Sequence, residues 1–170
     1  LWGQWLHLGF SRYIAREILF SLGTVDVPEY LDDLHRGEAQ AATSRYRGQA
    51  RVSLPGAGAT PRARRDAALE MMIRGEQAAA YLDEQLRQRG SGLPALASAL
   101  LLAARKHKRR RVDASVWTAV LEQHLGAAQA AVFWQIIEGK VSPSLHYGPC
   151  FRAKKFRYER IVVDVTKPER

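Results

Sequence analysis

Apolar residues recur at helical spacing in six stretches of this chain, and glycine, proline or short polar segments separate the stretches. In residues 4–22 the apolar side chains lie three or four positions apart, and Gly23 follows as a typical C-terminal cap. Asp26 and Pro28 then have the order of a helix N-terminus, which predicts a second helix over residues 28–46. A chain patterned in this way is limited to a mostly α fold.

The same criteria predict the remaining helices. Thr60 and Pro61 combine an N-cap with proline at the first helical position, and they open a long helix over residues 61–89. Asp113 or Ser115 caps one of the later helices, and Gly126 separates the last two. These later helices are predicted over residues 94–108, 114–125 and 127–138. Residues 156–165 alternate β-branched or aromatic residues with charged ones, which is typical of a strand or of a segment extended along another molecule.

The chain of 170 residues suffices for one compact domain, and 46% hydrophobic residues suffice for a packed core. No run approaches the roughly 20 apolar residues of a membrane span. We expect helical hairpins or a short helical-repeat array with a long basic loop and an extended C-terminal tail. The predicted divisions are an N-terminal helical hairpin over 1–46, a linker loop over 47–60, a helical-repeat-like region over 61–150 and a basic extended tail over 151–170.

Positive charge is concentrated in three short segments. The chain carries 26 Lys and Arg against 17 Asp and Glu, for a net charge of +9. Residues 45–65 contain six basic and no acidic side chains, residues 105–111 contain six basic side chains, and residues 151–170 contain seven basic against three acidic. The segments between them are mildly acidic. A helical body with basic connectors suits contact with a polyanion, of which nucleic acid is the first choice.

We therefore predict that these segments hold the phosphate backbone of an RNA, which positions the protein without reading bases. The simpler alternative is that they are solvated loops of a basic protein, an interpretation that would suffice for one such cluster. The predicted RNA-binding residues are Arg45, Arg47, Arg51, Arg62, Arg64, Arg65, Arg105, Lys106, Lys108, Arg109, Arg110, Arg111, Arg152, Lys154, Lys155, Arg157 and Arg160. Three aromatic residues are interleaved with the last five of these cations: Phe151, Phe156 and Tyr158. They are equally suited to stack on bases or to form the apolar face of a strand.

A weak internal repeat occurs in the last third of the chain. Val112, Ser115 and Val116 align with Val141, Ser144 and Leu145, each pair 29 positions apart, with two short helices between them. Trp117 opens the first helix, Leu-Gly stands at the turn, and small residues, Phe133–Trp134 and an exit Pro143 follow. This order resembles a pentatricopeptide repeat. An ordinary helical hairpin with an alanine-rich seam accounts for it equally well.

The pentatricopeptide resemblance implies a helical-repeat scaffold. Its base-reading position corresponds to Ala119, which has no hydrogen-bonding group, so the resemblance implies no base-reading code. Together with the basic loops and tail, the chain resembles a lineage-specific mitochondrial ribosomal protein. That resemblance implies a mitochondrial, structural component of a ribonucleoprotein particle, with rRNA backbone and neighbouring proteins as partners and with no small-molecule substrate.

Residues that could carry catalysis are scattered. None of the five histidines has another histidine three or four positions away, and the single cysteine, Cys150, has only His146 nearby. We expect no enzyme, no metal and no cofactor; a nucleophilic Cys150 with His146 or His124 as base is the less favoured alternative. The pairs Asp32–Asp33 and Asp83–Glu84 are expected to be exposed charges on helix faces.

A second functional class stays open. The amphipathic opening helix could lie at a lipid surface while basic loops meet anionic lipid, as in an accessory subunit of a membrane-bound respiratory assembly. We expect membrane contact to be the less favoured of the two.

Overall fold

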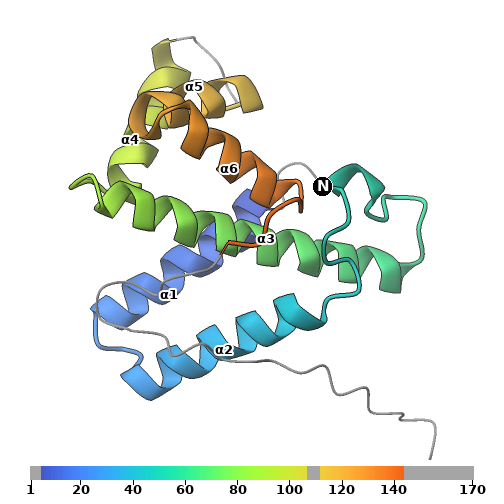
Figure 1. Ribbon diagram of the computed structural model, residues 1–170. Helices are drawn as coiled ribbons and strands as arrows, with labels where there is room; N and C mark the ends of the chain where they lie inside the picture. Colours follow the sequence, from blue (N-terminus) through green and yellow to red (C-terminus); the bar gives the residue numbers. More distant parts are fainter. Residues whose placement is uncertain (1–4, 107–111, 144–170) are drawn as a thin grey trace, which may run out of the picture.

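The computed structural model describes residues 5–106 and 112–143, and the described ranges are mostly α-helical, as the sequence predicts (Figure 1). The predicted tail over 151–170 and the strand over 156–165 lie outside the described residues. The elements, in chain order, are the π-helix η1 (Trp5–Phe10), α1 (Ser11–Ser21), α2 (Val27–Thr43), the short 3-10 helix η2 (Arg51–Ser53), α3 (Pro61–Arg87), α4 (Leu93–Lys106), α5 (Ala114–Leu125) and α6 (Ala127–Ile137).

The helix ends lie where the capping residues predict them. The Asp26 carboxylate accepts the backbone N–H of Glu29, and the Glu29 side chain accepts the N–H of Asp26, so a complete capping box opens α2. Thr60 caps α3 through the N–H of Ala63, and Asp113 is the cap of α5. The first element differs from its prediction, because residues 5–10 form a π-helix before α1 begins.

The long helix α3 lies at the centre, and η1, α1, α2, α4, α5 and α6 all contact it (Figure 1). The core over α3 is aromatic. Trp5 is fully buried, and its ring meets those of Phe10, Trp117 and Phe133 edge to face, with centroids 5.4–5.6 Å apart. Trp117 of α5 stacks on Phe133 of α6, so the first and last elements of the described chain share one aromatic cluster.

The crossing of η1 over α3 depends on two glycines. A Cβ atom on Gly75 would collide with the backbone of Trp5, and a Cβ atom on Gly9 would collide with the backbone of Gly75 and Glu76. Glycine inside a helix costs about 1 kcal/mol relative to alanine. The close approach of the two backbones explains why α3 contains one at position 75.

A network of charged groups lies where α1, α2 and α3 meet. The Arg16 guanidinium is 7% exposed and forms ion pairs with Glu76 of α3 and Asp33 of α2. Burial alone lowers the pKa of Arg16, but Glu76, Tyr30 and Asp33 together outweigh it, so the pKa lies above its usual value. This network joins the N-terminal helices to the centre of the fold.

The expectation that Asp83 is an exposed helix charge was wrong. Asp83 is 6% exposed, accepts a 2.8 Å hydrogen bond from the Tyr13 hydroxyl and pairs with Arg87 at 2.6 Å. Burial, and after it the Asp83 carboxylate, raises the pKa of Tyr13 above its usual value. The same expectation was wrong for Asp33, which is only partly exposed and pairs with Arg12 and Arg16. Asp32 is exposed, as expected.

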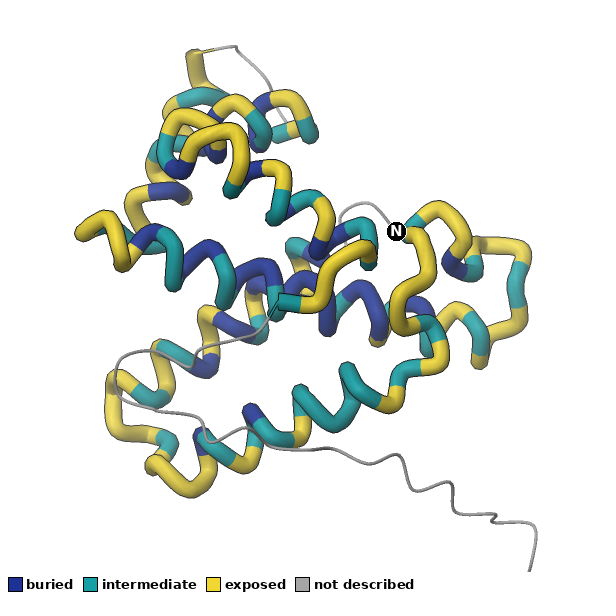
Figure 2. Tube along the Cα trace, viewed as in Figure 1, coloured by how far each residue is buried: buried dark blue, intermediate teal, exposed yellow. Residues whose placement is uncertain are grey.

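The outer face of α1 is apolar and exposed (Figure 2). Ile14, Ile18 and Leu22 follow one another at four-residue spacing and are 40%, 51% and 72% exposed; Leu8 and Leu19 lie beside them. Nothing in the described part of the chain covers this face. No helix among the described residues combines the length and the apolar character that crossing a membrane requires.

Candidate nucleic-acid interface

Three exposed arginines lie in the first turns of α3. Arg62, Arg64 and Arg65 directly follow the Thr60 cap, and the first turn of this helix contains no acidic residue. The N-terminus of a helix carries a partial positive charge, so cations there oppose the helix dipole by about 0.3–1 kcal/mol each. Helix stability therefore does not explain these arginines, and together with the helix end they form a strongly positive surface.

The segment between α2 and α3 is held against the middle of α3 by Arg74. The Arg74 side chain is 3% exposed, and its Nη2 donates to the backbone carbonyls of Gln49 at 2.8 Å and Tyr46 at 3.2 Å. Its charge is balanced by Glu70, one turn earlier in α3, at 2.7 Å. Glu70 also accepts the hydroxyl of Ser44 at the end of α2. A buried ion pair thus fixes the backbone of the basic segment without using any of its exposed cations.

The same arginine connects the segment to the last helix. The guanidinium of Arg74 lies against Gly139 and donates weakly to the Ile137 carbonyl, both at the end of α6. Gly139 has φ +77°, a conformation in which a side chain would be strained. Arg51 adds a second link, because its Nε pairs with Glu138 at 2.8 Å. The end of α6 therefore forms one wall of the candidate interface.

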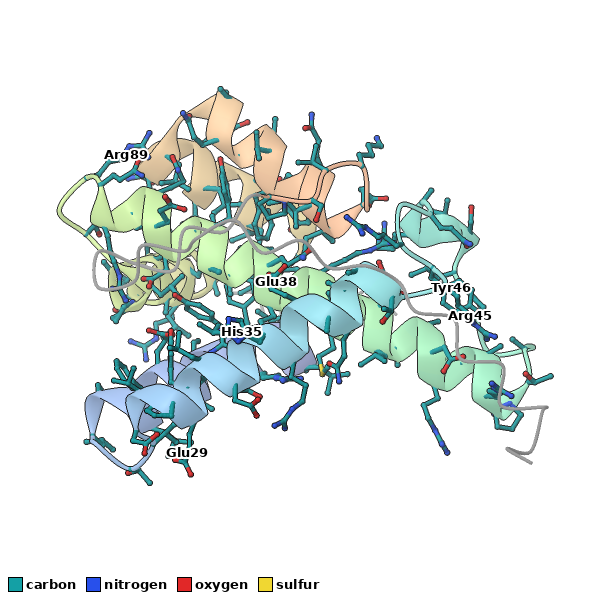
Figure 3. All side chains as sticks on the ribbon, turned by 60° about the horizontal axis from the view of Figure 1, so that its bottom comes forward. Glu29, His35, Glu38, Arg45, Tyr46 and Arg89 are labelled. Carbon is teal, nitrogen blue, oxygen red and sulfur yellow. The ribbon has the colours of Figure 1, made fainter. Side chains whose placement is uncertain are left out.

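The six predicted cations of residues 45–65 divide into two groups. Arg45 pairs with Asp66 at 2.9 Å and lies over the Tyr46 ring, and Arg51 is only 23% exposed in its pair with Glu138, so both are engaged within the fold. Figure 3 shows Arg45 and Tyr46 beside the N-terminal part of α3, with Arg89 at its opposite end. The other four, Arg47, Arg62, Arg64 and Arg65, are exposed and form no ion pair with a carboxylate of the described chain.

Lys140 is a further exposed cation without an ion pair in the described chain, and the sequence pattern does not indicate it. It follows α6, is exposed, and lines a pocket together with Arg47. It is the only Lys or Arg between residues 112 and 150, which form a mildly acidic stretch, so the distribution of charge along the sequence does not indicate it. Only the folded chain places it against the basic segment.

The second predicted cluster is only partly described. Arg105 and Lys106 are exposed in the last turn of α4, away from the N-terminal end of α3 (Figure 1). Cations at this end of a helix complement its dipole, so their contribution to helix stability accounts for their position. Lys108, Arg109, Arg110 and Arg111 lie outside the described residues, as do Arg152, Lys154, Lys155, Arg157 and Arg160.

The histidine and cysteine residues that could carry other chemistry are only partly described. No three His, Cys, Asp or Glu side chains of residues 5–106 and 112–143 are grouped so that they could hold a metal ion. Cys150 and His146 lie outside the described residues, and His124 is half-buried at the end of α5. Ala119 lines an apolar groove of about 500 Å³ between α4 and α5 and offers no group that could hydrogen-bond to a base.

Comparison with known proteins gives no further assignment: no family model, no curated protein and no solved structure matches this chain.

Proposed function

We propose that this chain is a non-catalytic structural component of a ribonucleoprotein particle and that it binds RNA backbone through the N-terminal end of α3. The observation that carries the proposal is a set of exposed cations that form no ion pair within the described chain. Arg62, Arg64 and Arg65 lie at this end of α3, and Arg47 and Lys140 line a pocket beside the middle of the helix. Each is free to neutralise a phosphate and release counterions. The proposed contact positions the protein and does not read bases.

The buried arginines support this assignment by contrast. Arg16 and Arg74 have carboxylate partners from other turns or helices, so the fold uses them. Arg62, Arg64 and Arg65 have no such role, and they lie where the helix dipole disfavours them. A polyanionic partner supplies the opposite charge that this end of α3 lacks.

The remaining basic residues extend the same proposal. Residues 105–111 and 152–160 are proposed as further backbone contacts, secondary to the end of α3. From the resemblance to mitochondrial ribosomal proteins, the proposed particle is mitochondrial and the proposed nucleic acid is rRNA. Neighbouring proteins are the proposed second class of partner, and no small-molecule substrate is proposed.

Fluorescence anisotropy with a labelled single-stranded RNA, measured at several salt concentrations, tests the proposal. The variant R62Q/R64Q/R65Q removes three exposed cations, and R36Q/R89Q removes exposed cations from α2 and from the far end of α3 as the control. We expect the triple variant to weaken binding about 100-fold at 0.1 M salt, since about three phosphate contacts are lost. Equal losses per removed charge in both variants would show a response to net charge alone and would contradict the proposal.

The exposed face of α1 favours a second candidate, the accessory subunit of a membrane-bound assembly. Leu8, Ile14, Ile18, Leu19 and Leu22 would lie in a lipid surface. Arg12 and Arg16, the cations of α1, are both engaged in ion pairs with Asp33 and Glu76, so they are not available to lipid headgroups. Sedimentation with phospholipid vesicles separates the candidates: binding that I18E/L22E abolishes, without any RNA binding, would favour the membrane.

A further inference from the structure

A pocket of about 200 Å³ lies between the segment that follows α2 and the turn that follows α6. Arg47 and Gly48 line one wall, and Gly139 and Lys140 line the other; α3 forms the floor with Glu70 and Arg74. The pocket thus brings together two cations that are 93 positions apart in the sequence. By volume it corresponds to roughly six or seven waters, enough for one phosphate group and its remaining hydration.

The floor of the pocket is electrically balanced. Arg74 donates to Glu70 through Nε, and the second carboxylate oxygen of Glu70 accepts the hydroxyl of Ser44. The Glu70 carboxylate is therefore satisfied by hydrogen bonds on both oxygens and its charge is offset by that of Arg74. The net charge of the pocket comes from Arg47 and Lys140.

Neither of these two cations is needed by the fold. Both are exposed, and the one hydrogen bond of the Arg47 guanidinium, to the Ala42 carbonyl, is long at 3.5 Å. Lys140 forms no ion pair with the described carboxylates. Their backbones are nevertheless fixed, since Arg74 holds the carbonyls of Tyr46 and Gln49 on one side and lies against Gly139 on the other. Two unpaired cations on two fixed walls match a single tetrahedral anion between them.

We propose that this pocket seats one phosphate of the RNA backbone, held by Arg47 from one wall and by Lys140 from the other. The inference rests on the proposed RNA-binding function and assigns one phosphate to a defined place in the interface. Arg74 is a positioning residue: it holds the two walls and does not touch the phosphate.

The test uses the full chain, a labelled single-stranded RNA and the variants R47Q, K140Q and R47Q/K140Q. R62Q and R64Q, singly and together, are the matched control, because they remove the same charges from exposed positions outside the pocket. If one phosphate is shared, the double variant R47Q/K140Q lowers the slope of log affinity against log salt by about 0.7, the value of one contact on a single strand. The control double variant R62Q/R64Q loses contacts to two phosphates, so it lowers the slope by about 1.4.

The affinities give an independent readout. We expect R47Q and K140Q each to weaken binding about fivefold, and the double variant to weaken it less than the product of the two, since both cations act on one group. The shared phosphate site is overturned if the affinity losses of R47Q and K140Q multiply exactly in the double variant and its slope change equals that of R62Q/R64Q. The proposed function would stay intact. Thermal unfolding of each variant confirms that the fold is retained.

The pocket can also be tested if the chain binds no RNA, a result that overturns the proposed function. The probe is then inorganic pyrophosphate, and the readout is the shift in melting temperature of the wild type and of R47Q/K140Q. A shift in the wild type that is lost in R47Q/K140Q, and kept in R62Q/R64Q, supports a phosphate site. The same shift in all three proteins, or none in any, overturns it.

Discussion

Exposed cations lie at the N-terminal end of α3 and in the last turn of α4, and their physical situations are opposite. Arg62, Arg64 and Arg65 lie at the N-terminal end of α3, whereas Arg105 and Lys106 lie in the last turn of α4. The helix dipole disfavours the first group and favours the second. Cations at the end of α4 thus stabilise the helix that carries them, while cations at the start of α3 oppose the dipole of their own helix.

A run of basic residues in the sequence is therefore informative only once the local electrostatics around each side chain are known. In the sequence, residues 45–65 and 105–111 each contain six basic side chains. In the structure, Arg45 and Arg51 are engaged by Asp66 and Glu138, and Arg105 and Lys106 complete a helix. Among the described residues of these two segments, the exposed cations without an ion pair or a favourable helix end are Arg62, Arg64 and Arg65 at the start of α3 and Arg47 at the pocket.

The largest effect is expected from Arg74→Ala, which removes the support of the proposed interface. The variant leaves Glu70 buried without its partner and releases the carbonyls of Tyr46 and Gln49. Breaking a buried ion pair costs about 3–5 kcal/mol of unfolding free energy, measured by urea denaturation. Arg36→Ala is the control, because it breaks an exposed pair of the same spacing with Asp32 and is expected to cost under about 0.5 kcal/mol. Equal costs would show that Arg74 does not hold this region together.

Gly75→Ala is expected to have the next largest effect, at a place remote from both basic ends. The added Cβ collides with the Trp5 backbone, so η1 must move, at a cost of about 1–3 kcal/mol. The control Gly37→Ala lies in α2, where a Cβ meets nothing closer than 4.0 Å, and it is expected to stabilise the protein by up to about 1 kcal/mol. Where the protein remains folded, Gly75→Ala should leave RNA affinity unchanged. A stabilising Gly75→Ala would contradict the close crossing of η1 over α3.

The variant R62Q/R64Q/R65Q is expected to raise stability while it lowers RNA affinity. Removing three cations from the positive end of α3 should increase the unfolding free energy by about 1 kcal/mol at low salt. Thermal denaturation at low and high salt measures this gain, which should shrink as salt screens the dipole. A clear loss of stability would show that the arginines support the fold, and would remove the main argument for their function.

The smallest effect on stability is expected from R105Q/K106Q, and it is a loss of stability where R62Q/R64Q/R65Q gives a gain. Losing two cations from the C-terminal turn of α4 should lower the unfolding free energy by about 0.5–1 kcal/mol, again more at low salt. Thermal denaturation under the same conditions as for the α3 variant provides the comparison. A gain in stability here would abolish the distinction between the two ends.

The helices were predictable because their signals are local. The Asp26–Pro28 start, the Thr60–Pro61 start and the glycine at 126 each act on neighbouring residues, and each prediction is confirmed to within a few positions at the helix ends. The π-helix at residues 5–10 was missed, because its close contact with Gly75 joins segments about 70 positions apart.

The burial of charged side chains in α3 was not predictable either, because it also depends on contacts between segments far apart in the sequence. Glu76 and Asp83 are buried only because Arg16 and Tyr13 reach them from α1, and no spacing within α3 indicates this. Among the candidate residues, the sequence predicted the basic segment but could not separate the engaged Arg45 and Arg51 from the exposed Arg62 and Arg64. Lys140 was missed because its neighbours in the pocket come from a distant part of the chain.

The proposed function requires that RNA phosphates meet the exposed cations at the start of α3. The salt dependence of RNA affinity, compared between the wild type and R62Q/R64Q/R65Q, is the decisive measurement. We predict that the slope of log affinity against log salt falls by about 2 for a single-stranded RNA, as expected for three lost phosphate contacts. A slope that does not change in the triple variant, in a protein that still binds RNA, would contradict the claim.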